Sequence, residues 1–189
     1  MGNFQPVLSF ALQAEGGYQC APSDSGNWTG GLCQAGDLVG TCMGISAPAL
    51  LAWLGPERAA SLTAAMMRNL DPGIAQAIYG SDYWIPVRGP ELPAGIDLMV
   101  FDAAVMSGVR RSVRLLQAAL AVVTDGYFGP QTMAGVQALP GDALIDLLAL
   151  QHERWLRQAP GAATYLDGWL ARLQQRQATA HNLLRDAST

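Results

Sequence analysis

The stretch Pro93–Gly108, PAGIDLMVFDAAVMSG, decides the fold of this chain. It opens with proline, which is common in the first turn of a helix, and it closes with glycine, which often ends one. The residues between them are apolar nearly all round a helical projection, and a helix of that kind is stable only when other elements cover every side. We therefore predict a helix from Pro93 to Ser107 that lies buried at the centre of the fold.

The remainder of the chain predicts further helices and almost no strand. Apolar spacing, capping residues and prolines indicate helices over residues 3–15, 46–53, 56–68, 71–83, 109–122, 130–139, 142–158 and 162–186. Residues 16–46 hold eight glycines, so this stretch favours a loop, within which residues 18–45 have room for a small β-hairpin. The predicted fold class is all-α, or mostly helical.

Composition excludes several classes of protein. The chain has 189 residues, of which 50% are hydrophobic and 14% are charged, so it is not intrinsically disordered. Its net charge of -4 argues against a nucleic-acid partner, because phosphate neutralisation calls for a basic surface. All the basic residues are arginine, which excludes Schiff-base and P-loop lysine chemistry.

The cysteines and the apolar stretches indicate the metal and disulfide chemistry of the chain and its cellular compartment. The cysteines, at positions 20, 33 and 42, have no CxxC spacing, so we expect no metal site, and either three thiols or one disulfide with an odd thiol. No basic residue lies near the start and the apolar run Val7–Leu12 is short, so we predict no signal peptide and synthesis in the cytoplasm. Residues 38–56 are uncharged but rich in glycine and proline, which argues against membrane insertion.

Glu15 is the strongest candidate for a catalytic residue. It lies eleven positions after Phe4, which is about three helical turns, so it falls on the apolar face of the first predicted helix. Gly16 and Gly17 end that helix and leave room for a bulky substrate. Desolvation and the negative end of the helix dipole both favour the neutral acid, which is the form that a general acid requires. The alternative is a helix that ends one turn earlier and leaves Glu15 solvated.

Three blocks of sequence carry a resemblance to a known family. The first block holds EGGY at 15–18, Asp24 and TCMGIS at 41–46. The second holds IY at 78–79, YW at 83–84, ELP at 91–93, FDAAV at 101–105 and SG at 107–108. The third holds LQAAL at 116–120, DG at 125–126, GP at 129–130 and Thr132. In this order they resemble the muramidases of glycoside hydrolase family 108, which include phage endolysins and secretion-associated lysozyme-like proteins.

The resemblance implies a lysozyme-like fold that cleaves peptidoglycan between N-acetylmuramic acid and N-acetylglucosamine. It implies a catalytic region over residues 1–108 and a helical peptidoglycan-binding region over 109–189, packed together as one compact unit. Glu15 aligns with the family's catalytic glutamate, and no cofactor is expected. Asp24 and Thr41 are predicted to orient a water molecule or to stabilise charge on the sugar. Their structural alternatives are an Asx turn and a backbone cap.

This sequence departs from the family pattern in two places. Residues 27–39 look inserted in the loop and add Thr29 as a second candidate, but Thr41 keeps the family's sequence context and is preferred. Met106 stands where the family commonly has asparagine, and methionine cannot replace an amide in a sugar contact.

Further residues are predicted to contact substrate: Tyr18, Tyr79, Tyr83, Trp84 and Asp102. Sugars stack on aromatic faces, although aromatic residues at helical spacing also serve as core. Asp102 lies in the apolar helix, where a carboxylate needs partners, so it either contacts substrate or ties neighbouring segments together from behind.

Several other polar residues have weaker functional indications. His152 and His181 are expected on solvated helix faces. Arg110, Arg111 and Arg114 open a helix, which is electrostatically unfavourable, and they are candidates to meet anionic groups of the cell wall.

The predicted function is that of a peptidoglycan hydrolase, an N-acetylmuramidase that serves host lysis or wall remodelling. Two alternatives stay open: a lytic transglycosylase that uses Glu15 alone, and a non-catalytic protein that binds the cell wall. Because no signal peptide is predicted, a holin or secretion machinery is expected to give a monomeric enzyme access to peptidoglycan in the periplasm or cell wall.

Overall fold

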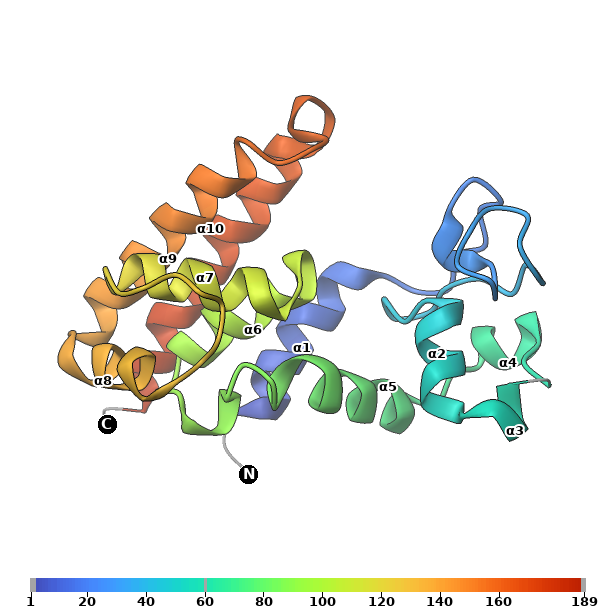
Figure 1. Cartoon of the computed structure of the whole chain (residues 1–189), viewed down its shortest axis with the longest axis horizontal. Coiled ribbons are helices and arrows are strands. Elements are labelled where there is room, and N and C mark those ends of the chain that lie inside the picture. Colours follow the sequence, from blue (N-terminus) through green and yellow to red (C-terminus); the bar gives the residue numbers. More distant parts are fainter. Residues whose placement is uncertain (1–2, 60, 188–189) are drawn as a thin grey trace. The chain divides into compact units, whose positions relative to one another are not determined.

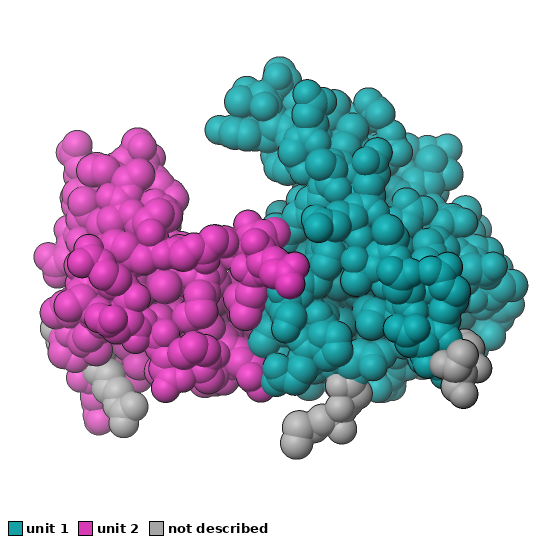
Figure 2. All heavy atoms as spheres, turned by 180° about the vertical axis from the view of Figure 1, so that it is seen from behind, with its two compact units in different colours: residues 1–11, 80–189 teal, residues 12–79 magenta. Residues whose placement is uncertain are grey.

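The computed structural model describes residues 3–59 and 61–187 of the chain. Helices account for 65% of it and its described residues form no sheet, which confirms the all-α prediction. The chain divides into two compact units (Figure 2). Unit 1 comprises Met1–Ala11 with Gly80–Thr189, and unit 2 comprises Leu12–Tyr79. The boundaries of these units differ from those of the predicted catalytic region (1–108) and wall-binding region (109–189). That functional division stays a prediction.

The helices follow the order predicted from the sequence (Figure 1). They are α1 (Phe4–Glu15), α2 (Ala47–Leu54), α3 (Pro56–Ala59), α4 (Ala64–Arg68), α5 (Pro72–Tyr79), α6 (Ile96–Ser107), α7 (Val109–Ala119), α8 (Pro130–Ala138), α9 (Gly141–Leu156) and α10 (Ala162–Asp186). Three short elements accompany them: the 3-10 helices η1 (Ser25–Asn27) and η3 (Gly89–Glu91), and the π-helical turn η2 (Gly80–Trp84).

The predicted helix over residues 56–68 is instead two helices, α3 and α4. Thr63 separates them, because its hydroxyl accepts a hydrogen bond from the backbone N–H of Met66 (3.3 Å) and so caps the start of α4. Its backbone is extended, with φ -121° and ψ 161°, so α-helix cannot continue through it. The sequence did not mark this break, since threonine also occurs inside helices.

Helix α6 is the centre of unit 1. Nine consecutive residues, from Ile96 to Ala104, are buried, and α7, α9 and α10 pack against the helix (Figure 1). The prediction of a buried central helix is therefore confirmed, with its first residue at Ile96. Gly95 precedes it with φ 83°, and a Cβ atom there would overlap the backbone carbonyl of Ala180 in α10. Glycine thus permits the close approach of the two helices.

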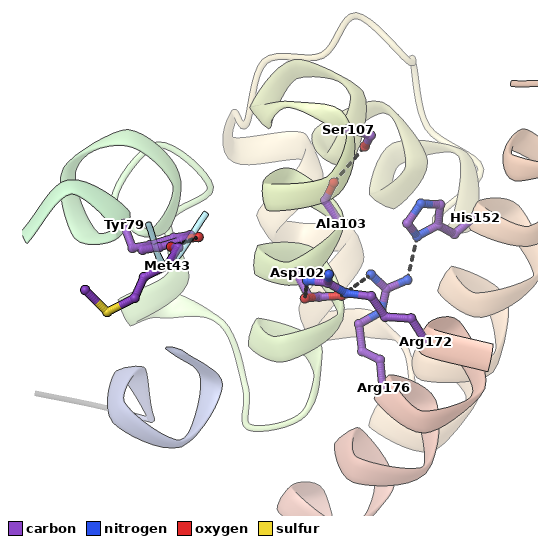
Figure 3. Close-up of polar contacts among 8 residues, drawn as sticks. All are labelled: Met43, Tyr79, Asp102, Ala103, Ser107, His152, Arg172 and Arg176. Atoms are coloured by element: carbon purple, nitrogen blue, oxygen red, sulfur yellow. Dashed lines mark hydrogen bonds and ion pairs between the residues drawn. The ribbon is translucent and has the colours of Figure 1, made fainter. Parts of the chain in front are cut away.

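A buried polar cluster joins α6, α9 and α10 (Figure 3). Asp102 pairs through both carboxylate oxygens, with Nη2 of Arg172 at 2.7 Å and with Nη1 of Arg176 at 3.0 Å. Arg176 also donates to Nδ1 of His152. The side chains of Asp102 and Arg176 have no exposed surface, and buried charges are tolerated only when they are paired in this way. Asp102 therefore ties α6 to α10, which is the structural alternative considered for it.

The prediction that His152 lies on a solvated face is wrong. Only 2% of the residue is exposed, because its ring points toward Arg176 of α10 instead of toward solvent. Burial, with the nearby charges of Arg176 and Arg172, lowers the pKa of His152 to about 2. The ring is therefore neutral, and its Nδ1 can accept the hydrogen bond from Arg176. His181 lies nearer the surface, with Nε2 2.9 Å from a carboxylate oxygen of Asp146.

Helices α8 and α9 meet at a bend of 120°. The buried residues of α9 include Leu144, Ile145 and Leu148. Within residues 3–59 and 61–187, no single helix is both long and apolar enough to cross a membrane, whereas this bent pair meets the criterion by length and composition alone.

Replacing Asp102 with alanine should destabilise the fold strongly. The change leaves the guanidinium of Arg176 buried without a counter-charge, which typically costs about 3–5 kcal/mol of unfolding free energy. Urea denaturation measures this difference. Asp146→Ala is the matched control, because that carboxylate is largely exposed where it pairs with His181, and its loss should cost less than about 1 kcal/mol. Equal costs for the two variants would contradict the role given to Asp102.

Asp97, in the first turn of α6, should make stability depend on pH. Burial raises the pKa of this carboxyl from 3.8 to about 6, so its contribution to stability is fully present below pH 3.8 and is lost as the pH rises through about 6. The difference amounts to about 3 kcal/mol. Asp97→Asn removes the titration, so its unfolding free energy relative to the unchanged chain should rise between about pH 4 and pH 7. Urea denaturation across this range measures the relative value, and a constant difference would refute the expectation.

Candidate active site

Glu15 is the last residue of α1. Val7, Leu8 and Ala11 form the buried stripe of the helix, and Gly16 leaves the helix with φ 70°. The helix therefore reaches Glu15 instead of ending one turn earlier, and the residue is half-buried. The local geometry predicted from the apolar spacing and the glycine pair is present.

A tight turn passes beside the Glu15 carboxyl. Cys42 and Ile45 exchange two backbone hydrogen bonds, of 2.8 and 3.2 Å, and the residues between them, Met43 and Gly44, have φ 49° and 72°. Positive φ at both central residues is typical of a two-residue hairpin turn, in which glycine is favoured. A Cβ atom on Gly44 would lie only 3.0 Å from Oε2 of Glu15. Glycine at this position therefore lets the backbone approach the carboxyl directly.

Tyr79, the last residue of α5, holds this turn in place (Figure 3). Its hydroxyl donates a hydrogen bond to the backbone carbonyl of Met43 at 3.1 Å, and a Cβ atom on Gly44 would overlap that hydroxyl. Tyr79 is 2% exposed. Because the tyrosine, the turn and Glu15 all belong to unit 2, this arrangement is internal to one compact unit.

Asp24 and Thr41 meet around Gly26. Oδ1 of Asp24 accepts a hydrogen bond from the backbone N–H of Gly26 (2.9 Å), and Oγ1 of Thr41 donates to the carbonyl of the same glycine (3.4 Å). A Cβ atom on Gly26 would lie 3.3 Å from Oδ1 of Asp24 and 3.8 Å from Oγ1 of Thr41. Asp24 thus makes the local bond of an Asx turn, yet it stays exposed. Thr41 lies three residues before Gly44, in the segment that leads into the turn beside Glu15.

Two amide side chains that the sequence analysis missed orient Asp24. Nε2 of Gln19 donates to Oδ2 of Asp24 (2.8 Å) and to Oδ1 of Asn27 (3.0 Å), and Nδ2 of Asn27 donates back to Oε1 of Gln19 (2.8 Å). Asn27 is fully buried, and its carbonyl accepts from the backbone N–H groups of Val39 and Gly40. No periodic pattern marks amides in a glycine-rich loop, so only the fold could reveal this pair.

Thr29, the second threonine candidate, has a local structural role. Its Oγ1 accepts a hydrogen bond from the backbone N–H of Asp37 (2.8 Å), and its own N–H donates to the carbonyl of Asp37 (3.0 Å). Next to this pair, Trp28 and Leu38 form an isolated antiparallel bridge. Such isolated bridges, in the described part of the loop, stand in place of the predicted small hairpin.

Three of the residues predicted to contact substrate lie in the core. Trp84 is 5% exposed and packs against Phe4 and Phe101, with ring-centroid distances of 5.2 and 5.8 Å. Asp102 has no exposed surface and binds arginine through both oxygens, and Tyr79 is engaged with the turn already described. Large aromatic residues stabilise a fold most when they are buried. A role in the core is the alternative that the helical spacing of these aromatic residues indicated. We therefore do not retain these three residues as substrate contacts.

Tyr18 and Tyr83 are half-buried and keep some accessible surface. The hydroxyl of Tyr18 donates to the carbonyl of Val39 (3.2 Å), and the guanidinium of Arg68 lies over its ring, 4.7 Å from the centroid. A hydrogen bond with Cys20, together with burial, raises the pKa of the Tyr18 hydroxyl, so the phenol is neutral. Of the aromatic candidates in unit 2, Tyr18 is the one that keeps surface open to a sugar.

The described residues offer no metal centre and no disulfide. Across residues 3–59 and 61–187, no group of three or more histidine, cysteine, aspartate or glutamate side chains is placed to hold a metal ion. The three cysteines are free thiols, of which Cys42 is buried and Cys33 is exposed.

A helical fold that presents one carboxyl at a helix end, near a loop with a second carboxyl and a hydroxyl, has the groups that glycoside hydrolysis needs. Residues 8–108 match the family described as Glycosyl hydrolase 108, and the chain belongs to this family. The solved structure of SagA from Brucella abortus is 31% identical to it, with a TM-score of 0.81, and the match covers 100% of this chain and 99% of that one. No curated protein matches the chain. Membership of the family makes the chain a glycoside hydrolase and supports a peptidoglycan hydrolase in general.

Gly44→Ala should impair the site more than the fold. The new methyl group would overlap the hydroxyl of Tyr79 and lie 3.0 Å from Oε2 of Glu15, so the turn or the carboxyl must move. Displacement of a reacting group by about 1 Å can cost about 100-fold in rate. Clearing of purified cell walls, followed by turbidity, measures the activity.

Gly31→Ala is the matched control for this variant. Gly31 has the same φ of 72°, but a Cβ atom there would make only an ordinary contact, 3.5 Å from Pro48. The left-handed backbone should cost both variants about 1–2 kcal/mol of stability, to which Gly44→Ala adds the overlap with Tyr79. Only Gly44→Ala should lose most of its activity. Equal activities for the two variants would show that the turn does not position Glu15.

Proposed function

We propose that the chain is an N-acetylmuramidase, which hydrolyses the bond between N-acetylmuramic acid and N-acetylglucosamine in peptidoglycan with Glu15 as general acid. The observation that carries this proposal is the position of Glu15, at the end of α1 and directly beside the turn at Gly44. Cβ atoms on Gly16 and Gly17 would meet nothing within 4 Å. The two residues that follow Glu15 are therefore bordered by open space, which a sugar polymer would need.

In the proposed reaction, Glu15 donates its proton to the glycosidic oxygen while the bond from that oxygen to the anomeric carbon breaks. The ring left behind gains oxocarbenium character, and a negative or polar group near it lowers the barrier. Asp24 suits this role, because bonds from Gln19 and from the N–H of Gly26 fix both of its oxygens. A water molecule then adds to the anomeric carbon and gives its proton to the Glu15 carboxylate, which restores the acid, while the hydroxyl of Thr41 orients that water.

The same proposal places the enzyme on glycan strands in the periplasm or cell wall. There it would serve host lysis or wall remodelling as a monomer, and it would reach the wall through a holin or a secretion machinery. Co-expression with and without such a pore tests the route, since lysis that is independent of it would contradict this part of the proposal.

Glu15→Gln should abolish hydrolysis and leave the fold intact. Glutamine keeps the shape of the side chain but cannot donate a carboxyl proton, and general acid catalysis typically contributes about 100- to 10,000-fold. Release of soluble muropeptides from purified wall, separated by chromatography, measures the rate. Glu57→Gln, a change at an exposed position of α3, is the matched control and should retain full activity.

Mass spectrometry of the same digests distinguishes the alternatives. Fragments that end in reducing N-acetylmuramic acid are expected, whereas anhydro ends would identify a lytic transglycosylase that uses Glu15 alone. Undiminished digestion by Glu15→Gln would falsify the assignment of the acid. Binding of wall without digestion by the unchanged chain would identify a non-catalytic wall-binding protein.

A further inference from the structure

A pocket of about 350 Å³ lies on one face of α7, in unit 1. Its lining residues are Arg111, Arg114, Leu115, Ala118 and Thr124. The first four recur three and four positions apart, so they share a single face of the helix. Thr124 comes from the loop that follows α7. No residue of this pocket takes part in the catalytic proposal for Glu15.

The two arginines of the pocket have no counter-charge in the described part of the chain. Other arginines pair with carboxylates, as Arg157 does with Glu153 at 2.7 Å, but no such pair involves Arg111 or Arg114. Nε of Arg114 is also buried without a hydrogen-bond partner among the described residues. The pocket therefore concentrates positive charge in a chain whose net charge is -4.

This concentration of charge is unfavourable for the chain by itself. Arg111 and Arg114 are three positions apart on a helix, a spacing at which like charges repel. Arg111 also lies in the first turn of α7, where the helix dipole disfavours cations. A bound anion would relieve both effects, and none of the neighbouring carboxylates does so.

Asp125, which follows Thr124 in the sequence, is engaged with other groups. Its Oδ1 accepts from Nε2 of Gln117 (2.7 Å) and from the backbone N–H of Tyr127 (2.8 Å). The hydrogen bonds from the N–H of Tyr127 and from Gln117, and to a smaller extent the charge of Arg110, lower the pKa of Asp125. Arg110 itself lies over the ring of Tyr127, 5.3 Å from the centroid. Arg110 and Asp125 thus belong to one local arrangement, and the pocket arginines are left outside it.

Packing orients the two arginines of the pocket. The guanidinium of Arg111 lies over the ring of Trp155, 5.4 Å from the centroid, which fixes its plane and leaves N–H groups at its edge for a ligand. A Cβ atom on Gly126 would lie 3.2 Å from Nε of Arg114, so the loop packs closely along that side chain. Two oriented guanidinium groups above an apolar floor suit a planar anion with a small aliphatic neighbour.

We propose that this pocket binds a carboxylate of a short peptide, between the guanidinium groups of Arg111 and Arg114. A methyl group next to the carboxylate would lie against Leu115 and Ala118, and the hydroxyl of Thr124 would bond a peptide group. The source of the ligand rests on the proposed function, which makes it the stem peptide of peptidoglycan, a chain that includes alanine and D-glutamate residues and carries free carboxylates. The pocket would then hold the peptide branch while the catalytic site acts on the glycan.

Direct titration with a defined peptide tests this site without using catalysis. The probe is acetyl-L-alanyl-γ-D-glutamyl-L-alanine, which carries two carboxylates, and its diamide is the uncharged comparison. Isothermal titration calorimetry should show binding of the acid and at least about tenfold weaker binding of the diamide. Arg111→Gln and Arg114→Gln should weaken binding of the acid to a similar extent. Arg110→Gln is the matched control, since Arg110 does not line the pocket, and it should bind as the unchanged chain does.

The outcomes separate this inference from the proposed function. Absence of binding, equal binding of the acid and the diamide, or equal weakening in all three arginine variants would overturn the site. Tighter binding of glycerol phosphate than of the peptide would overturn the choice of a carboxylate ligand. Glu15→Gln should keep full affinity for the peptide while it loses hydrolysis. Failure of peptide binding would therefore leave the proposed hydrolysis standing, and failure of hydrolysis would leave the binding site standing.

Discussion

The pairing of Asp102 with two arginines is the constraint on which the structure of unit 1 depends. The carboxylate lies in the middle of α6, a helix that neighbours cover on every side, so water cannot solvate its charge. Arg172 and Arg176 occupy both of its oxygens, and a pair of this kind forms only when α10 has one particular register along α6.

His152 extends the same constraint to α9. As a neutral ring it accepts from Nη2 of Arg176, so that nitrogen has a partner without the addition of another charge. A protonated ring would place a third cation in the cluster, and burial with two arginines nearby is what keeps the pKa of His152 at about 2. The polar cluster therefore specifies how three helices meet, while the apolar residues around it supply the area that excludes water.

The candidate active site is built from backbone geometry as much as from side chains. The turn at Gly44 approaches Glu15 because a residue without Cβ occupies it, and Tyr79 fixes that turn through one hydrogen bond. In the neighbouring loop, Gln19 and Asn27 form a closed amide pair that fixes one oxygen of Asp24. Groups that are held in advance need no reordering during a reaction, and this is the usual way in which enzymes stabilise developing charge.

The sequence by itself determined the features that depend on local order. Apolar residues on all sides of 96–104 require burial, and the glycine pair after Glu15 ends a helix, so the central helix and the position of the candidate acid could be predicted from spacing. The tertiary structure decided which way the remaining side chains face: Trp84 and Asp102 turn into the core, and His152 binds an arginine 24 positions away in sequence. Periodicity is a property of neighbours along the chain, whereas a partner across the fold is chosen by packing between helices, which no short stretch of sequence contains.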